Sequence, residues 1–268
     1  MKIANDKYYT SKDLAFYCVE KTKEILGTEN ITEYLEPSAG SGVFLEYFDK
    51  PFLAYDIEPE DNKNRVQTQD FLQLDLPYKK GRCIIGNPPF GIKNTLSVQF
   101  YKKSILLGDY IVFILPISQY KNNQQMFDFD LIYSEDLGIR KYSDRDVHCC
   151  LNIYKRNPNG LNKKPKNKLK DVTIIEVRKN NKIVDNYDLR LLAWGTGKNG
   201  LKLGGIISGD KNYAKEFFIK VNNEKYKEKI IQLLTNVDWE KEYSMTATPN
   251  LLQWQVYKYL KDNVGGIE

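Results

Sequence analysis

Up to about residue 155, segments with hydrophobic residues at helical spacing alternate with short, continuous hydrophobic runs typical of strands. Residues 12–26 place apolar side chains at helical spacing and are followed by Gly27, which predicts an amphipathic helix. Short apolar runs bounded by turn residues predict strands at 31–35, 52–57, 66–68, 82–86, 110–115, 131–134 and 148–154. Further helices are expected at 42–48 and 95–107. Strands that alternate with helices indicate an α/β fold, in which helices flank a largely parallel sheet.

The pattern changes at residues 156–170, which hold two prolines, one glycine and six Lys or Arg residues without any acid. This composition predicts a mobile linker. Beyond it we expect a strand pair at 172–177 and 182–184, a glycine-rich run at 194–205, and helices at 224–234 and 251–260. The sequence therefore predicts two parts: residues 1–156, and residues 157–268 as a linker followed by a small basic α+β region.

Charge is distributed unevenly between these parts, although the whole chain carries a net charge of only +5. Residues 1–150 hold 18 Lys or Arg and 22 Asp or Glu, whereas residues 151–268 hold 22 basic and 13 acidic residues. The positive excess in the second part indicates a polyanionic partner such as nucleic acid. A solvated lysine-rich surface explains the same counts equally well, so charge alone does not decide between the two interpretations.

Several function classes are disfavoured by what the sequence lacks. No apolar region follows residues 1–6, and the longest apolar run, residues 110–116, is much shorter than a membrane span. We therefore expect no secretory signal, no membrane association and a cytoplasmic protein. The chain has one histidine, His148, and its cysteines form no CxxC pair, which argues against a metal site. We expect these cysteines to be reduced residues of the core: Cys18, Cys83, Cys149 and Cys150.

The first candidate motif is a glycine turn that follows the predicted strand 31–35. It contains Glu36, Ser38, Gly40 and Gly42. Glycines let the backbone come close to a ligand, and the helix expected next would offer its first N–H groups to a carboxylate or phosphate. A purely structural turn would have the same sequence pattern.

Two acidic positions follow later strands. Asp56 ends the strand at 52–57 and is placed to accept hydrogen bonds from both hydroxyls of a ribose. Asp70 and Phe71 follow the strand at 66–68, where the acid would accept from an adenine amine while the ring covers the base. Each has a structural alternative: an N-cap or surface acid for Asp56, and an N-cap with a core phenylalanine for the pair.

The most specific pattern is Asn87-Pro88-Pro89-Phe90, directly after the apolar strand 82–86. The two prolines remove backbone donors and stiffen the turn, which fixes the Asn87 side-chain oxygen and the Pro88 carbonyl as acceptors. Two acceptors directed at one amino group hold both of its hydrogens and orient its lone pair. Phe90 offers a ring on which a planar substrate can stack. The alternative is a Pro-Pro turn that merely ends a strand.

Together these segments resemble the motifs of the amino-methyltransferases with the Rossmann-like S-adenosylmethionine fold. Residues 36–42 resemble the first motif, 56–59 the second, 70–72 the third and 87–90 the catalytic fourth. Residues 8–11 are similar to the segment that precedes the first helix and contacts the methionine end of the cofactor in many members. Ser11 stands where those members usually have a proline. The resemblance covers about residues 8–156.

The resemblance implies a class I methyltransferase sheet with S-adenosylmethionine as cofactor and no metal. It implies catalysis by Asn87, Pro88, Pro89 and Phe90. It implies cofactor contacts from Tyr9, Thr10, Glu36, Ser38, Gly40, Gly42, Asp56, Ile57, Asp70 and Phe71. Residues 1–156 would thus form the cofactor-binding catalytic domain, and residues 157–268 a target-recognition region assigned only by position and charge.

The order of the motifs, with the cofactor motif first and target recognition last, is similar to the gamma group of DNA adenine methyltransferases of restriction–modification systems. Residues 147–156, with aromatic side chains and a basic end, are similar to their late strand behind the target base. The resemblance implies methylation of N6 of an adenine flipped out of double-stranded DNA, with a cognate restriction endonuclease as a further partner. The alternatives are an RNA adenine, a protein glutamine amide and a non-catalytic nucleic-acid-binding module. Phe90 favours a base, because the glutamine enzymes usually carry Tyr there.

Overall fold

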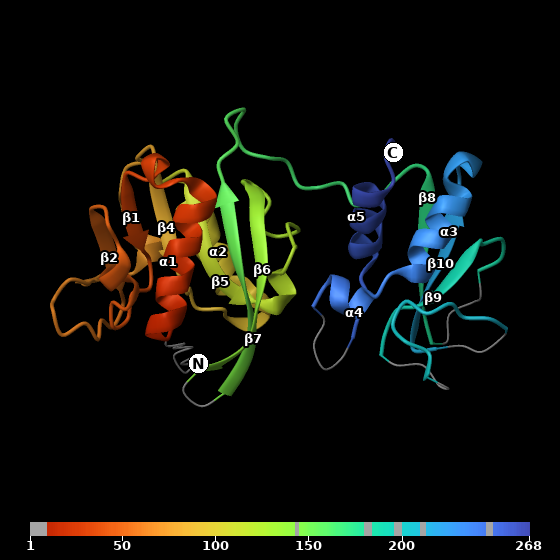
Figure 1. Cartoon of the computed structure of the whole chain (residues 1–268), viewed down its shortest axis with the longest axis horizontal. Coiled ribbons are helices and arrows are strands. Elements are labelled where there is room, and N and C mark those ends of the chain that lie inside the picture. The colour runs from red at the N-terminus through yellow and green to blue at the C-terminus, as the bar shows by residue number, and fades with distance from the viewer. Residues whose placement is uncertain (1–9, 143–144, 180–183, 196–199, 210–212, 245–248) are drawn as a thin grey trace. The chain divides into compact units, whose positions relative to one another are not determined.

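The computed structural model describes residues 10–142, 145–179, 184–195, 200–209, 213–244 and 249–268. The chain divides into two compact units, Met1–Pro165 and Lys166–Glu268 (Figure 1). The residues expected to form the linker, 156–170, are therefore shared between the two units.

A seven-stranded mixed sheet is the framework of the first unit. Its strands are β1 (Glu33–Glu36), β2 (Phe52–Asp56), β3 (Gln67–Thr68), β4 (Arg82–Gly86), β5 (Tyr110–Pro116), β6 (Asp130–Tyr142) and β7 (Arg145–Lys155). They lie in the order β3-β2-β1-β4-β5-β7-β6, with β1 to β5 parallel and β7 antiparallel to both of its neighbours. The strand order reverses between β1 and β4, as in doubly wound nucleotide-binding sheets. The predicted Rossmann-like α/β sheet is confirmed.

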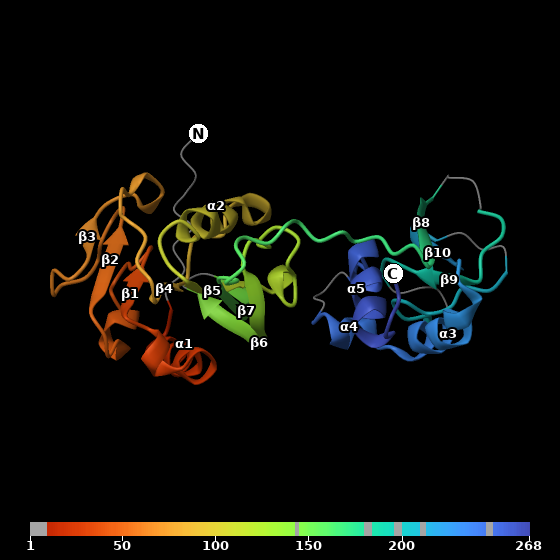
Figure 2. The ribbon, with the colours of Figure 1, turned by 90° about the horizontal axis from the view of Figure 1, so that it is seen from above.

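Helices cover both faces of this sheet, with α1 (Lys12–Leu26) on one face and α2 (Thr95–Ser104) on the other (Figure 2). Successive strand residues point to opposite faces, so Val112 of β5 packs on the α1 side and Phe113 on the α2 side. The adjacent residues Cys149 and Cys150 are divided between the same two clusters. All four cysteines are buried and none forms a disulfide, as expected.

The first helix begins and ends where its local sequence directs. The Ser11 hydroxyl accepts a hydrogen bond from the Leu14 N–H at 3.3 Å, so Ser11 is the N-cap of α1. Gly27 follows the last helical residue with a φ of 78°, a conformation that only glycine adopts without strain. The residue that departs from the family's usual proline therefore has a structural role in this chain.

The connection between β1 and β2 differs from the prediction. In place of a helix at 42–48, the structure has a four-residue 3-10 helix, Phe44–Tyr47. Carbonyls of the preceding turn are bonded to a later loop: the Glu60 N–H donates to the Gly40 carbonyl at 2.9 Å, and Arg65 Nη2 donates to the Gly42 carbonyl at 3.5 Å. The helix prediction was wrong, because apolar spacing over seven residues does not encode these contacts.

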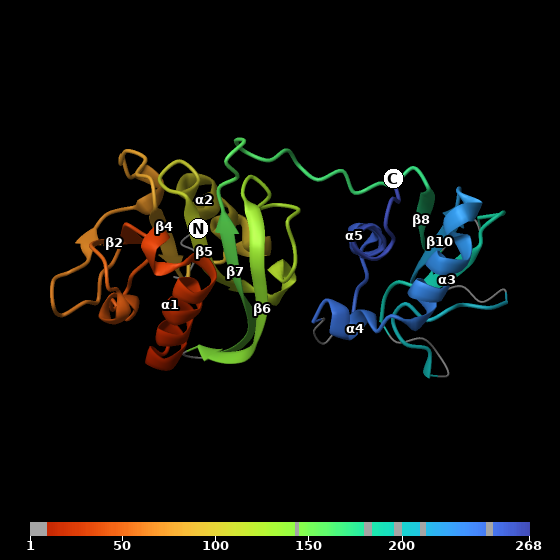
Figure 3. The same ribbon diagram turned by 45° about the horizontal axis from the view of Figure 1, so that its top comes forward.

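The last two strands of the sheet are longer than predicted. Figure 3 shows β6 and β7 side by side, and their pairing runs well beyond the expected segments 131–134 and 148–154. Register shifts lie between Leu131 and Tyr133 and between Asp136 and Gly138. Such bulges interrupt the alternation of polar and apolar side chains, which explains why the sequence pattern reveals only parts of each strand.

In its described residues, the second unit has a three-stranded antiparallel sheet in the order β8-β10-β9 and three α-helices. Its elements are β8 (Val172–Arg178), β9 (Leu189–Leu192), β10 (Lys215–Val221), α3 (Lys227–Asn236), α4 (Trp239–Glu242) and α5 (Gln253–Asn263). One buried cluster joins Phe217 of the sheet to Ile230 of α3 and Leu260 of α5. Three elements, β9, β10 and α4, were not predicted from the sequence. Of the strand expected at 182–184, only Val184 lies within the described residues, and it is not in a strand, while β8 pairs with β10 over its whole length.

Candidate functional site

Three polar side chains from the predicted motifs lie where parallel strands end. Glu36 is the last residue of β1, Asp56 is the last residue of β2, and Asn87 directly follows β4. Because β2 and β4 flank β1 in parallel, their carboxyl ends meet at the same edge of the sheet, where the strand order reverses. Ligands of open α/β sheets bind at this position. The structure therefore brings the first, second and fourth motifs together.

The glycine turn after β1 leaves room above its backbone. Gly40 has a φ of 51°, and a Cβ placed on it would meet no atom within 4 Å. Gly42 has a φ of 74° and lies closer to its surroundings, since its Cβ would come within 3.1 Å of Arg65 Nη2. Gly40 thus provides an open backbone surface for a ligand, whereas Gly42 allows close packing against the neighbouring loop.

Asp56 stabilises this turn from the neighbouring strand. Its Oδ2 accepts from the Gly40 N–H at 2.8 Å, and its Oδ1 accepts from the Glu58 N–H at 2.8 Å. A carboxylate has about four acceptor sites, so both oxygens retain capacity for further donors such as hydroxyls. The next side chain, Ile57, is 61% exposed, which places an apolar surface beside the carboxylate.

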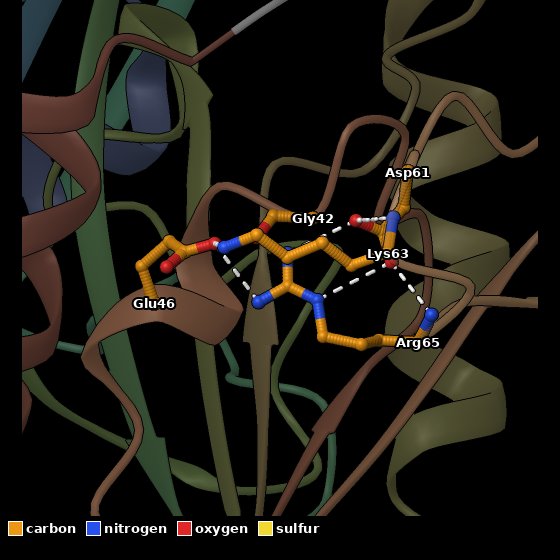
Figure 4. A network of polar contacts seen from close by, with 5 residues as sticks. All are labelled: Gly42, Glu46, Asp61, Lys63 and Arg65. Carbon is orange, nitrogen blue, oxygen red and sulfur yellow. Dashed lines mark hydrogen bonds and ion pairs between the residues drawn. The ribbon is translucent and has the colours of Figure 1, made fainter.

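An ion-pair network that the sequence analysis did not find fixes the loop after β2 against the same turn (Figure 4). Arg65 pairs with Asp61 at 3.0 Å and with Glu46 at 2.9 Å, and Lys63 pairs with Glu46 at 2.8 Å. The hydrogen bond from Arg65 lowers the pKa of the Asp61 carboxyl. The same guanidinium contacts the Gly42 carbonyl, so this network braces the glycine turn in place of the expected helix.

Glu36 is a buried acid with an incomplete set of partners. The residue is 2% exposed, and its Oε2 has no hydrogen-bond partner among the residues that the structure describes. Burial, followed by the nearby Asp56 carboxylate, raises the pKa of Glu36 well above its ordinary range, and Arg65 opposes this shift. Leaving a buried polar atom unsatisfied costs about 1–3 kcal/mol, so a cationic or hydrogen-bonding ligand would be favoured at this position.

The Asn87 turn is held by residues from two other segments. The Asn87 Nδ2 donates to Thr10 Oγ1 at 3.2 Å, and the Ser38 hydroxyl donates to the Asn87 carbonyl at 3.3 Å. Asn87 is 9% exposed, and the Pro89 carbonyl accepts from the Ser97 hydroxyl at 3.2 Å. The predicted catalytic turn is therefore connected to the first cofactor motif through Ser38 and to the segment before α1 through Thr10.

The aromatic residue of this turn lies in the core. Phe90 is 5% exposed and packs in the cluster on the α1 side of the sheet. The chain then turns at Gly91, whose φ is 67° and whose Cβ would come within 3.0 Å of the Leu96 N. Only glycine fits this conformation and this space, so Gly91 is a further residue that shapes the turn, and its place directly after Phe90 was the available signal.

Asp70 and Phe71 have the contacts of a helix N-cap and a core phenylalanine, which was the alternative to a cofactor-binding role for this pair. The Asp70 Oδ1 accepts from the Leu72 N–H at 2.9 Å and begins a 3-10 helix, Phe71–Gln73. Phe71 is 1% exposed and packs against Phe100 of α2, with ring centroids 5.2 Å apart. Their contacts with a cofactor stay a prediction. Tyr9, which is also predicted to contact the cofactor, lies outside the described residues.

Other sites are not indicated in the part of the chain that the structure describes. Its His, Cys, Asp and Glu residues form no group of three suited to a metal ion. His148 pairs with Asp136 at 2.6 Å between β7 and β6, away from the Asn87 turn in sequence and sheet order. Within the same residues, no helix is long and apolar enough to cross a membrane.

Known proteins with a similar structure share little sequence with this chain. No family model matches it, and no curated protein matches its sequence. A structure titled as a proposed RNA methyltransferase from Pyrococcus horikoshii is 15% identical, with 56% of this chain and 86% of that chain covered and a TM-score of 0.45.

Two further structures have the same kind of similarity. A proposed class I S-adenosylmethionine-dependent methyltransferase from Listeria monocytogenes is 13% identical, covering 61% of this chain and 65% of that chain, with a TM-score of 0.46. A type I restriction-modification methyltransferase subunit from Streptococcus thermophilus is 15% identical, covering 56% and 45%, with a TM-score of 0.41. These similarities concern the fold alone.

Proposed function

We propose that the chain transfers a methyl group from S-adenosylmethionine to the N6 amine of adenine in double-stranded DNA. The observation that carries this proposal is the position of the Asn87-Pro88-Pro89-Phe90 turn, which follows β4 and is hydrogen-bonded to Ser38 of the adjacent glycine turn. A turn that orients an amine and a turn suited to the cofactor thus share one sheet edge. Direct transfer between two bound groups requires this proximity.

The residues around the glycine turn fit S-adenosylmethionine. Glu36 would accept from its ammonium group through Oε2, which has no hydrogen-bond partner among the described residues. Gly40 offers open backbone surface, Asp56 retains acceptor capacity for the ribose hydroxyls, and Ile57 would cover the adenine ring. When bound, S-adenosylmethionine supplies an electrophilic methyl group.

Asn87 and the Pro88 carbonyl would hold the two hydrogens of the target amine. Thr10 engages the Asn87 Nδ2, which orients the amide so that Oδ1 is its acceptor side. The lone pair of the held amine then points away from both acceptors. An aromatic amine is a poor nucleophile, so alignment and fixed dipoles supply most of the acceleration, and no covalent enzyme intermediate is expected. Phe90 would stack on the base once the ring leaves the core cluster.

DNA adenine is the substrate that the sequence features favour together. These features are the motif order, Phe90, and the positive excess after residue 150. The base must leave the duplex to reach the Asn87 turn, as for other enzymes that modify bases. The proposal includes double-stranded DNA and a cognate restriction endonuclease as partners, and RNA adenine is the alternative that the substrate assay distinguishes.

The test is Asn87→Ala, assayed by methyl transfer to genomic DNA, RNA and protein, with mapping of the modified base. Loss of one well-placed contact in a preorganised site lowers the rate by about 10²–10³, roughly 3–4 kcal/mol. We expect this loss on DNA, with cofactor affinity nearly unchanged in calorimetry. Turnover above a tenth of wild type would remove Asn87 from the proposed role, and transfer mainly to RNA or protein would reject the DNA substrate.

Asn122→Ala is the matched control. Asn122 is also 9% exposed, and its Nδ2 donates to the Ser118 carbonyl at 2.8 Å, so its removal costs a similar structural contact. Its expected effect is a modest loss of stability with methyl transfer within a few-fold of wild type. Equal losses of activity in both variants would mean that the effect of Asn87→Ala is structural.

A further inference from the structure

The positive charge of the second part is concentrated in its linker. Residues 155–170 hold seven Lys or Arg and no acid, whereas residues 171–268 hold 15 basic and 13 acidic residues. The expected basic α+β region is therefore almost neutral once the linker is set apart. This distribution changes where a polyanion would bind.

Ion pairs further offset the cations of the folded part. Arg190 pairs with Glu216, Lys220 and Lys227 with Asp188, Arg178 with Glu176, and Lys258 with Asp262. A cation already paired with a carboxylate gains less from a phosphate, because it must first lose that partner. Exposed lysines without an ion pair remain among the described residues of the folded part, but they are spread along its sequence from Lys179 to Lys261 and do not lie in one short segment.

Arg156, the first cation of the expected linker, has a structural role. Its guanidinium donates to the Gly108 carbonyl at 2.9 Å and to Asp109 Oδ1 at 3.1 Å, and it lies 4.6 Å from the centroid of the Phe129 ring. These contacts attach the end of β7 to the loop before β5. The segment with the most available charge therefore begins after Arg156.

Five lysines after Arg156 form what we call the lysine strip: Lys163, Lys164, Lys166, Lys168 and Lys170. All five are exposed, and among the described residues the first four form no ion pair. Lys170 has a single exposed contact, with Glu268 at 3.2 Å. The strip is the densest group of solvated positive charge in the described part of the chain.

Exposure alternates along the strip as in an extended chain. Lys164, Lys166, Lys168 and Lys170 are exposed, whereas the residues between them are partly buried, and Leu169 packs against the core of the second unit. Alternate residues of an extended chain lie on one side, about 6.6 Å apart. The strip thus presents four lysine side chains on one side of an extended segment.

Hydrogen bonds hold the chain just before the strip. The Asn162 side chain donates to Asp130 Oδ1 at 2.7 Å, and its N–H donates to the Asp128 carbonyl at 2.8 Å. At the other end, the Asn222 side chain donates to the Lys170 carbonyl at 2.8 Å. Each end of the strip is thus hydrogen-bonded within its own unit.

We propose that the lysine strip, rather than the folded part at 171–268, provides most of the electrostatic affinity for the phosphate backbone of the nucleic acid substrate. This inference rests on the proposed function and assigns its polyanion contact. Binding to phosphates through lysines is independent of sequence and releases counterions, so it positions the duplex without selecting a base.

The test compares two variants that each lose five positive charges. The strip variant changes all five strip lysines to Gln. The control variant changes five exposed lysines of the folded part that form no ion pair among the described residues: Lys179, Lys202, Lys229, Lys241 and Lys261. Affinity for a labelled DNA duplex is measured by fluorescence anisotropy over a salt series, and cofactor calorimetry checks that both variants are folded.

We expect the strip variant to bind DNA at least tenfold more weakly at about 0.1 M salt, with its log–log salt slope reduced by about 4. The control variant should change affinity by less than threefold. Equal losses in the two variants would show a general effect of net charge and would overturn the inference. Wild-type binding by the strip variant, or a larger loss in the control variant, would also overturn it.

Further binding measurements, with the Asn87→Ala chain and with other ligands, separate this inference from the proposed function. Binding is measured without turnover, so an inactive Asn87→Ala chain that still binds through the strip supports the strip by itself. Strip-dependent binding of an RNA duplex in preference to DNA would support the phosphate contact and reject the DNA substrate. Strip-dependent binding to phosphatidylserine vesicles without binding to either duplex would overturn the inference.

Discussion

Glu36 in the first unit and Glu216 in the second are both 2% exposed, yet their surroundings differ. Glu216 Oε2 accepts from Arg190 Nε at 2.7 Å, and its Oε1 accepts from the Tyr213 N–H. One oxygen of Glu36 has no partner among the described residues, and no cation forms a hydrogen-bonded pair with it there. Both carboxylate oxygens of Glu216 thus accept hydrogen bonds within the second unit, whereas one oxygen of Glu36 in the first unit accepts none from the described residues.

This difference separates a buried acid whose partners all lie within the chain from one that leaves a hydrogen-bonding position open. A buried ion pair needs all of its hydrogen bonds to offset desolvation, and the Arg190–Glu216 pair meets this condition with Arg190 also donating to the Gly209 carbonyl at 2.7 Å. A buried acid that lacks a partner lowers stability unless a ligand supplies one. The comparison therefore predicts opposite outcomes when the two acids are replaced.

The largest effect is expected for Glu216→Ala. The substitution leaves the Arg190 guanidinium buried beside the Phe218 ring without its carboxylate, which should destabilise the second unit by about 3–5 kcal/mol. All three tryptophans, Trp194, Trp239 and Trp254, lie in this unit, so tryptophan fluorescence during urea unfolding reports on it selectively. The transition should move to clearly lower urea concentration.

The matched control for this prediction is the double variant Arg190→Met with Glu216→Leu. Because it removes both charges, it should lose much less stability than Glu216→Ala. Cofactor affinity, which we assign to the first unit, should be the same in both variants. Similar stability of Glu216→Ala and wild type would contradict a structural role for the pair.

A smaller effect is expected for Asp56→Ala in the first unit. The change removes the acceptor proposed for the ribose hydroxyls and also the hydrogen bonds to the Gly40 and Glu58 N–H groups. Calorimetry should show S-adenosylmethionine affinity about 10- to 100-fold lower, roughly 1.4–2.8 kcal/mol. Asp238→Ala provides the control, because the Asp238 side chain caps α4 in the second unit. An equal loss for Asp238→Ala would show that the effect of Asp56→Ala does not come from a lost cofactor contact.

The sequence predicted those parts of the site that depend on neighbouring residues. The strand at 82–86 and the Asn87-Pro88 turn are contiguous, so one local pattern encodes both, and the structure has β4 at Arg82–Gly86. The contact between Asn87 and Thr10 joins residues 77 positions apart. The position of Arg65 against Gly42 likewise depends on a loop that closes over the turn. Neither contact leaves a periodic signal in the sequence.

The second unit was less predictable because its strands carry charged residues that are buried. β10 begins with Lys215 and Glu216, which are 4% and 2% exposed, and a sequence pattern places such residues at the surface. Their partners come from distant segments: Lys215 Nζ donates to the Leu251 carbonyl at 2.6 Å. Tertiary contacts therefore decide the strand, and the apolar stretch that remains is too short to indicate it.

The smallest effect is expected for Glu36→Gln, and its sign is opposite to that of Glu216→Ala. The raised pKa of Glu36 means that the folded chain binds a proton that the unfolded chain releases, so stability falls as pH rises from the ordinary carboxyl pKa toward the folded one. Removing this group should stabilise the first unit at neutral pH by about 1 kcal/mol, or roughly 2–4 °C. Calorimetry is the appropriate measurement, because the tryptophans do not report on this unit.

Glu33, at the other end of β1, provides the control for that prediction. Burial favours its neutral form, but hydrogen bonds from Lys79 at 2.7 Å and Arg82 at 2.6 Å outweigh burial and lower the pKa of Glu33. Its contribution to stability is therefore present at neutral pH and is lost as pH falls through the lowered pKa. Glu33→Gln should destabilise the unit without weakening cofactor binding, whereas Glu36→Gln should stabilise it and weaken binding. A loss of stability in both variants would show that Glu36, too, is held by partners within the chain.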